Sequence, residues 1–585
     1  MAFTYTIGCG VTKSALAAFI RRAHEGGVDI HALSYRKNGK PAAELALPPY
    51  SFDQRAQLYS LSKSFTSIAV GIAADEGLLR EDEKIADIFP DKLPADAPEA
   101  VREARLCDLL SMQSGHGVCA LADMLEGDPI VKFLQAPMPH KPGTTFLYST
   151  GATCICAAAV ERRAGVSLTD YLEERLFRPL GIAKPFWKTL NGVTLGGVGL
   201  YLSAADLVPF AEMLRCGGVY GGKRIVSEQW IKKATSRHSL DVNNGSHDWT
   251  AGYGYQFWLN DNGKGYRGDG AFGQLCIVIP DRKITFIMLA EATNMQTEMD
   301  IIMDFIEHDS TPDGPDELPE DLYAPAPTAK TAFSYAWHCE ENAAGIRALR
   351  LDCDGEVLRI TRTDARGEET IRAGNGRYAV SNYTMTKLYP CISQLEAYAP
   401  FEKLKAAAYY TLEDGAVTVT LRHLESPHTE YWRFSLGEEP EWSLAARTGV
   451  IGTHCRKPYI GSREAVNDGL PFKKQPAFGR SKRVMIFFRA PRFLRQAGCI
   501  AACLSVSPIF IAGRTSSQLS RSIQIVSVYP FTAQKPFSIP TRRQAWHPKI
   551  PSPLHSHCVS RRAAHKKARP TWDGLLPHTF PYEIT

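Results

Sequence analysis

The first 300 residues begin and end with strand-like segments and hold helix-like segments between them, and this order limits the possible folds. Residues 28–47 read as two strands joined at Asn38-Gly39, a dipeptide that tolerates the positive φ angles of a tight hairpin turn. Strand patterns return only near residue 250, in GYGYQFWL, QLCIVIP and KITFIML. One sheet therefore has to bring its first and last strands together, with helices packed on it, which predicts an α/β (α+β) body.

Composition divides the rest of the chain. Residues 309–328 contain five Pro and a cluster of acids, as an extended linker does, so we place a first domain at 1–308. Residues 329–438 show short alternating strands separated by Asp354-Gly355 and Asp414-Gly415, which are turn dipeptides. This pattern predicts a small antiparallel β domain, either a barrel or a sandwich.

The remaining residues, 439–585, differ in charge. Residues 441–585 carry 23 Lys and Arg against 5 Asp and Glu, in a chain whose net charge is +5. The segment is rich in Pro, Ser and Arg and has no sustained periodicity, so we expect a disordered tail. Contact of this tail with nucleic acid or an anionic membrane is one interpretation. The other is that the tail has no selected role, and the lack of a nucleic-acid-binding motif favours it.

The spacing of the cysteines and the pattern of the N-terminal residues indicate which cofactors and which cellular compartment to expect. The 14 Cys form no C-x-x-C pair, so we expect neither a metal nor another cofactor. Irregularly spaced Cys in a long chain are typical of a reducing compartment. Residues 12–27 have apolar side chains at helical spacing with Arg among them, which indicates an amphipathic helix rather than a signal peptide. We therefore expect a cytoplasmic protein.

The segment YSLSKSFTSIAVGIAADEGLL, residues 59–79, contains the pattern S-x-x-K at Ser60 and Lys63. On a helix these positions share one face, so the lysine amine can reach the serine hydroxyl, as a nucleophile and its base require. For Lys63 to act as a base, its pKa has to lie below the ordinary value of about 10.4, which burial can cause. The alternative is an N-cap serine and a solvated lysine. Ser34 and Lys37 repeat the pattern, but on a strand, where the two residues point to opposite faces.

Residues 59–79 resemble the nucleophile segment of the serine β-lactamase-related family, which contains class C β-lactamases, penicillin-binding DD-peptidases and esterases of the same fold. The stretch LLSMQSGH at 109–116 resembles a loop of that family, and residues 141–182 resemble its second catalytic segment almost throughout. The likeness covers roughly residues 25–305. It implies a β-lactamase/transpeptidase-like fold, with an antiparallel sheet flanked by helices.

The resemblance also implies roles for single residues. Ser60 corresponds to the acylated nucleophile and Lys63 to its partner, and Tyr148 matches the tyrosine of the Y-x-N element, a general base or proton relay. Thr150 stands where that element usually has Asn, so a hydroxyl replaces part of an amide contact to the substrate.

The third family element, K-T-G or H-x-G, departs further from the family pattern. Gly270 falls on a family glycine, but Gly268 stands where Lys or His is expected, and Arg267 or Asp269 is left to fill that role. The backbone N–H near Ala271 can still complete an oxyanion hole, since a backbone donor does not depend on the side chain. The missing basic residue argues against substrates that are recognised by a carboxylate.

Together these residues predict a serine hydrolase of the class C β-lactamase-related type. It would act on a small ester or amide through an acyl-enzyme at Ser60, with Lys63 and Tyr148 moving the proton and with Thr150, Gly270 and Ala271 binding the substrate. The alternative is a catalytically inactive β-lactamase-like module that only binds a ligand. His116, in SGHG, is expected to be a loop histidine, because the Ser-x-x-Lys chemistry requires no histidine.

Overall fold

The computed structural model describes residues 4–447, apart from 9, 240–245, 313, 318–321, 323, 340–341, 343, 385–402 and 437–440. The described residues all belong to one compact unit, Met1–Cys503. Apart from residues 441–447, the tail expected over 439–585 lies outside the described residues, and so do its expected contacts.

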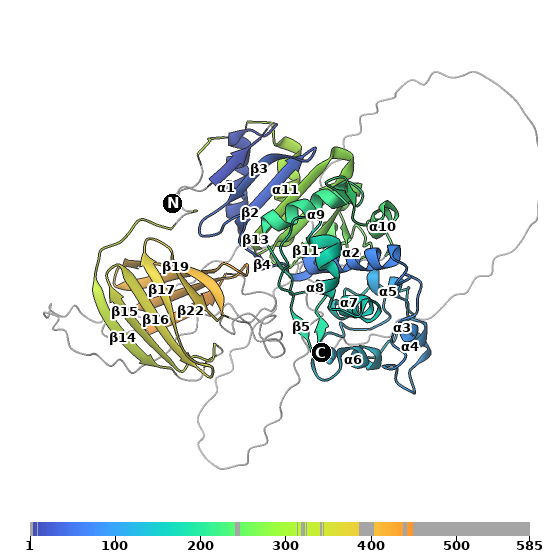
Figure 1. Cartoon of the computed structure of the whole chain (residues 1–585). Helices are drawn as coiled ribbons and strands as arrows, with labels where there is room; N and C mark the ends of the chain where they lie inside the picture. The colour runs from blue at the N-terminus through green and yellow to red at the C-terminus, as the bar shows by residue number, and fades with distance from the viewer. Residues whose placement is uncertain are drawn as a thin grey trace, which may run out of the picture. The chain divides into compact units, whose positions relative to one another are not determined.

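The first sheet has seven described strands in the order β1-β3-β2-β13-β12-β11-β10, and all its neighbouring strands are antiparallel (Figure 1). The strands β2 (Val28–Lys37) and β3 (Lys40–Ala46) form the expected hairpin, with φ angles of 53° at Asn38 and 76° at Gly39. Because β2 also pairs with β13 (Ile284–Ala292), the prediction that the first and last strands meet is confirmed. The other strands are β1 (Thr4–Ile7), β10 (Trp258–Leu259), β11 (Tyr266–Gly270) and β12 (Gln274–Ile279).

Helices cover both faces of this sheet. Alternate residues of β12 enter two separate cores: Leu275 and Ile277 pack with α1 (Lys13–Glu25) and α11 (Met295–His308), whereas Cys276 and Val278 face the other core. The main helices of that second core are α2 (Ser62–Asp75), α5 (Leu106–Leu110), α6 (Pro129–Gln135), α7 (Thr150–Ala164), α8 (Leu168–Leu172), α9 (Ala204–Arg215) and α10 (Glu228–Ala234). This arrangement is the β-lactamase/transpeptidase-like fold that the sequence predicts.

The second sheet has nine described strands, which follow the first sheet in the chain. Its turns at Asp354-Gly355 and Asp414-Gly415 fall where the sequence predicts them, and among the described pairs only β17 with β19 is parallel. Trp442 is buried in the same core as Trp337, so the last strand belongs to this sheet although it lies beyond residue 438. The strands are β14 (Ala332–His338), β15 (Ala348–Asp354), β16 (Val357–Asp364), β17 (Gly367–Asn375), β18 (Ala379–Tyr383), β19 (Leu404–Glu413), β20 (Ala416–His423), β21 (Thr429–Ser435) and β22 (Glu441–Ala446).

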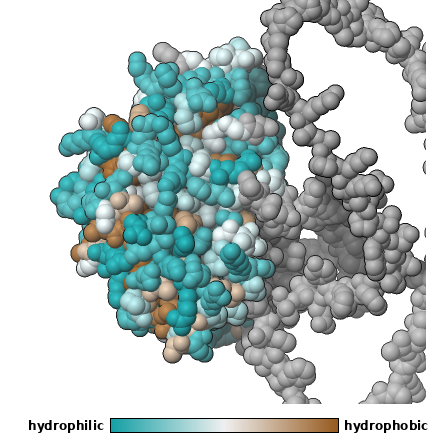
Figure 2. Space-filling view, turned by 90° about the vertical axis from the view of Figure 1, so that its right-hand side faces the viewer, coloured by the Kyte–Doolittle hydropathy of each residue, from teal (hydrophilic) through white to brown (hydrophobic). Residues whose placement is uncertain are grey.

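The surface is mostly polar on the face drawn in Figure 2, where hydrophobic residues are scattered among hydrophilic ones. No helix in the described part of the chain has the length and apolar content needed to cross a lipid bilayer.

Candidate active site

Ser60 lies in a short 3-10 turn, η1 (Tyr59–Leu61), directly before α2. The strand β4 (Ala56–Gln57), which pairs with β7 (Tyr201–Leu202), leads into this turn. Tyr59 has a φ of 48°, so the chain bends sharply just before Ser60, and the hydroxyl of Ser62 donates a hydrogen bond of 2.6 Å to the Tyr59 carbonyl. The α-helix begins at Ser62, two residues after Ser60.

The Lys63 amine is buried beside Ser60, with 1% of the residue exposed. Its Nζ donates to Ser60 Oγ at 3.0 Å, to Thr150 Oγ1 at 3.1 Å and to the carbonyl of Gly197 at 2.8 Å. The solvated lysine of the alternative interpretation is therefore wrong. In the second S-x-x-K pattern, by contrast, Ser34 donates to Glu44 at 2.8 Å and Lys37 pairs with Asp309.

Gly197 is a contact that the sequence patterns did not identify. A Cβ atom built on Gly197 would lie 2.8 Å from Thr150 Cγ2, and one on Gly196 would lie 2.5 Å from Ala157 Cβ. Two glycines in succession therefore let this loop approach α7 closely enough for its carbonyl to reach Lys63. The glycine pair in LGGVGL was the available signal.

Tyr148 also lies next to the lysine, with Lys63 Nζ 4.9 Å from the centre of its ring. The half-buried ring stacks on Trp258 with centroids 5.4 Å apart. Burial, followed by the charge of Asp269, raises the pKa of Tyr148 well above its ordinary value, while hydrogen bonds with Ser60 and Trp258 oppose this shift. The phenol therefore keeps its proton at neutral pH and can donate it.

Thr150 is the first residue of α7, after the N-cap Ser149. Its hydroxyl accepts the hydrogen bond from Lys63, so the residue that replaces the family Asn contacts the amine directly. Ser60, Lys63, Tyr148 and Thr150 thus come together as the sequence places them.

Gly268 and Gly270 pack against the segment that carries Ser60. A Cβ on Gly270 would lie 2.0 Å from the carbonyl oxygen of Leu58, and one on Gly268 would lie 2.4 Å from Leu61 Cδ1. The space of the usual Lys or His is thus already filled at position 268. Ala271 directly follows β11, the strand that contacts η1.

The sequence left Arg267 and Asp269 as candidates for the role of the missing Lys or His. The surroundings of these two side chains differ in the structure. Arg267 is fully buried, its Nε lies 3.1 Å from Asp269 Oδ2, and its guanidinium lies 4.5 Å from the centre of the Trp249 ring. A substrate cannot reach it. Burial raises the pKa of Asp269, and the nearby charges of Arg267 and Lys63 oppose this shift.

Other candidate groups lie elsewhere. His116 is buried, with Nδ1 bound to Ser114 Oγ at 3.0 Å and Nε2 to the Phe133 carbonyl at 3.1 Å, so both ring nitrogens are engaged. Within the described residues, His247, Asp248 and Asp300 are the one group whose side chains converge closely enough for a metal. The buried Asp248 carboxylate already accepts hydrogen bonds from other protein groups, so the cluster does not require an ion.

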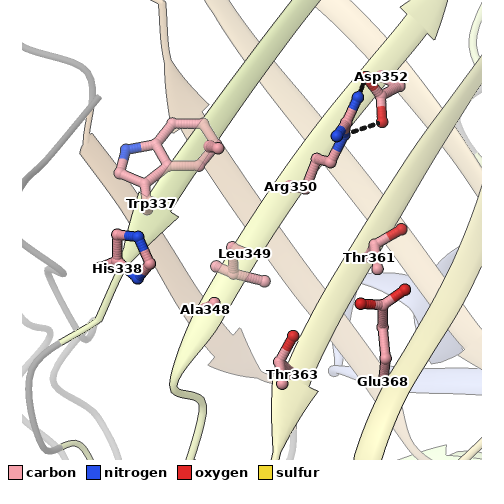
Figure 3. A pocket seen from close by; sticks show the side chains of 10 residues that line it. Trp337, His338, Ala348, Leu349, Arg350, Asp352, Thr361, Thr363 and Glu368 are labelled. Atoms are coloured by element: carbon pink, nitrogen blue, oxygen red, sulfur yellow. Dashed lines mark hydrogen bonds and ion pairs between the residues drawn. The ribbon is translucent and has the colours of Figure 1, made fainter. Parts of the chain in front are cut away.

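A hollow of about 450 Å³ opens on the second sheet, on strands β14 to β17 (Figure 3). An ion pair between Arg350 and Asp352, 2.7 Å apart, lies at one end, and Thr363 and Glu368 lie toward the other. None of the expected site residues lines this hollow.

The first 300 residues are similar to known proteins. Residues 16–302 match the family described as Beta-lactamase. Penicillin-binding protein 4 of Amycolatopsis lactamdurans is 28% identical over 257 residues, which cover 38% of this chain and 67% of that protein. The 6-aminohexanoate-dimer hydrolase of Paenarthrobacter ureafaciens is 24% identical over 254 residues, covering 40% and 65%. The chain thus spans about two thirds of the length of these curated relatives.

Among solved structures, the octameric penicillin-binding protein homologue from Pyrococcus abyssi is similar, with a TM-score of 0.41 and 18% identity. The likeness covers 73% of this chain and 98% of that one.

Proposed function

We propose that this chain, which belongs through residues 16–302 to the serine β-lactamase-related family, hydrolyses a small ester or amide by a class C-type mechanism with Ser60 as the nucleophile. The observation that carries the proposal is the 3.0 Å contact between Lys63 Nζ and Ser60 Oγ at a buried position. A carbonyl and a hydroxyl accept two further hydrogen bonds from Lys63. A neutral amine that donates to these two acceptors can turn its lone pair toward Ser60.

The reaction would proceed in two stages. Ser60 Oγ bonds to the substrate carbonyl carbon and its proton passes to Lys63, while the N–H groups of Ser60 and Ala271 bind the oxyanion. The proton then moves through the Tyr148 phenol to the leaving alcohol or amine as its bond to carbon breaks. A water molecule then attacks the acyl carbon, and the same residues carry its proton to Ser60 Oγ. The bond between Ser60 and the acyl group breaks, and the carboxylic acid is released.

Tyr148 fits the role of relay better than that of base. Its raised pKa disfavours the phenolate, whereas a protonated phenol near Ser60 can donate one proton while it accepts another. The lysine amine is then the proton acceptor in the first step.

The same residues restrict the substrate. A substrate carboxylate would find no side chain at Gly268, and Arg267 is enclosed, while Asp269 carries a carboxyl group itself. We therefore expect neutral esters or amides to be better substrates than carboxylate-bearing lactams or peptides.

Labelling of the full chain with a fluorophosphonate probe tests the proposal. We expect covalent labelling of the wild type and of Ser34→Ala, none of Ser60→Ala, and a loss in turnover of p-nitrophenyl butyrate of at least about 1,000-fold for Ser60→Ala. Ser34 is the matched control because it begins the other S-x-x-K pattern. A wild type that binds ligands but neither reacts with the probe nor turns over the ester would be the inactive binding module instead.

A further inference from the structure

Three buried aromatic side chains from separate parts of the chain meet behind the proposed oxyanion hole. Tyr59 comes from η1, Phe272 from the turn after β11, and His428 from the turn between β20 and β21. The ring of Phe272 lies 5.2 Å from that of Tyr59 and 4.6 Å from that of His428, both edge to face. The second sheet thus contributes one ring to a cluster formed with the first domain.

The two rings of the first domain flank the expected oxyanion donors. Tyr59 directly precedes Ser60, and Phe272 directly follows Ala271. Both have left-handed backbone conformations, with φ angles of 48° and 69°. Such angles cost free energy in residues other than glycine and persist only where the surroundings enforce them.

His428 lies where it can hold the backbone conformations of Tyr59 and Phe272. Its Nε2 lies 2.6 Å from the hydroxyl of Tyr59, and its Nδ1 faces Glu291 of β13, 3.8 Å from Oε1. Burial lowers the pKa of His428, although Glu291 opposes this shift. A neutral ring with its proton on Nδ1, toward the carboxylate, would accept the hydrogen bond of the Tyr59 phenol at Nε2.

The β20–β21 turn is held against the first domain at further points. The backbone N–H of Gln57, three residues before Ser60, donates to the Glu425 carbonyl at 3.0 Å. Leu424 packs on Tyr50 in a small apolar cluster that does not include Tyr59 or Phe272. The position of His428 is therefore fixed independently of the two rings that it contacts.

We propose that His428 is a positioning residue for the hydrolysis: it holds Tyr59 and Phe272, and through them the N–H groups of Ser60 and Ala271, in the geometry that binds an oxyanion. The inference rests on the proposed function. It also means that the first domain needs the second sheet for full activity.

Kinetics of the full chain with p-nitrophenyl butyrate test this role. His428→Ala is expected to lower kcat roughly 10- to 100-fold with little change in KM, because misplaced oxyanion donors weaken transition-state binding rather than substrate binding. His428→Gln keeps an acceptor for the phenol and should recover most of the loss. Tyr59→Phe should lower kcat as well, and adding it to His428→Ala should cost little more. Val380→Ala, at an exposed position of β18 in the second sheet, should keep kcat near the wild-type value.

The outcomes separate the two proposals. Ser60-dependent turnover with an unchanged kcat in His428→Ala would overturn only the role of His428. An equal loss in Val380→Ala, or a Gln variant no better than the Ala variant, would do the same. A wild type without Ser60-dependent labelling or turnover would overturn the proposed function and this inference with it. If His428→Ala does not fold, the kcat values of Tyr59→Phe and His428→Gln test the role instead, since these side chains are close in size to the ones that they replace.

Discussion

Lys63 is the residue on which the proposed chemistry depends most, because its buried amine contacts the Ser60 hydroxyl. In Lys63→Ala the proton acceptor is lost, so we expect the kcat for p-nitrophenyl butyrate to fall roughly 100- to 10,000-fold, the range of general-base catalysis. Lys37→Ala is the control, because Lys37 ends the other S-x-x-K pattern and pairs with Asp309. Similar losses in the two variants would argue against the assignment.

At this scale the sequence predicted the groups that a short pattern encodes. Ser60 and Lys63 are one turn apart, so their spacing brings them near, whereas Tyr148 and Thr150 were assigned through the resemblance to the family's Y-x-N element. The carbonyl of Gly197 joins Lys63 across 134 positions, and His428 reaches Tyr59 across 369. Such contacts depend on tertiary packing, so they cannot be predicted from the spacing of residues in a short pattern.

At the scale of elements, the packing of β11 on η1 fixes the site, and Gly270 makes that packing possible. In Gly270→Ala the new methyl would lie 2.0 Å from the Leu58 carbonyl oxygen, a backbone atom that cannot rotate away. We expect a loss of stability of about 1–3 kcal/mol and a larger fractional loss of activity, measured by urea unfolding and ester turnover. Gly117→Ala, whose nearest atom is a proline side-chain carbon at 3.0 Å, should behave much like the wild type. A fully active Gly270→Ala would contradict this account.

The elements that the sequence predicted best have strong local signals. The β2–β3 hairpin follows from Asn38-Gly39, and the turns of the second sheet follow from Asp-Gly dipeptides. The turn η1 was not predicted, because Tyr59 adopts a positive φ without a glycine. The strand β22 was not separated from the basic tail, since its place depends on burial of Trp442 with Trp337, far away in sequence.

At the scale of the whole described unit, a buried charged group joins the two sheets. Asp29 of β2 pairs with Arg422 of β20 and with Arg447 after β22. Next to it, His31 stacks on Tyr50, with ring centroids 3.7 Å apart. Loss of this contact region would affect both sheets at once, so the stability of the unit should respond to the protonation of groups buried there.

The lowered pKa of His31 predicts how the stability of the unit changes with pH. Burial lowers its pKa to about 3, with Arg422 and Arg447 adding to the effect and Asp29 opposing it. In the unfolded chain the pKa is about 6.5, so between pH 6.5 and 3 only the unfolded state binds the proton. The contribution of His31 to stability is thus complete above pH 6.5 and falls by about 1.4 kcal/mol for each pH unit below it. Urea unfolding at pH 7.5, 5.5 and 4.5 measures this effect. On acidification, the free energy of unfolding should fall less in His31→Asn than in the wild type or in His338→Asn, an exposed control. An equal fall in all three proteins would refute this assignment.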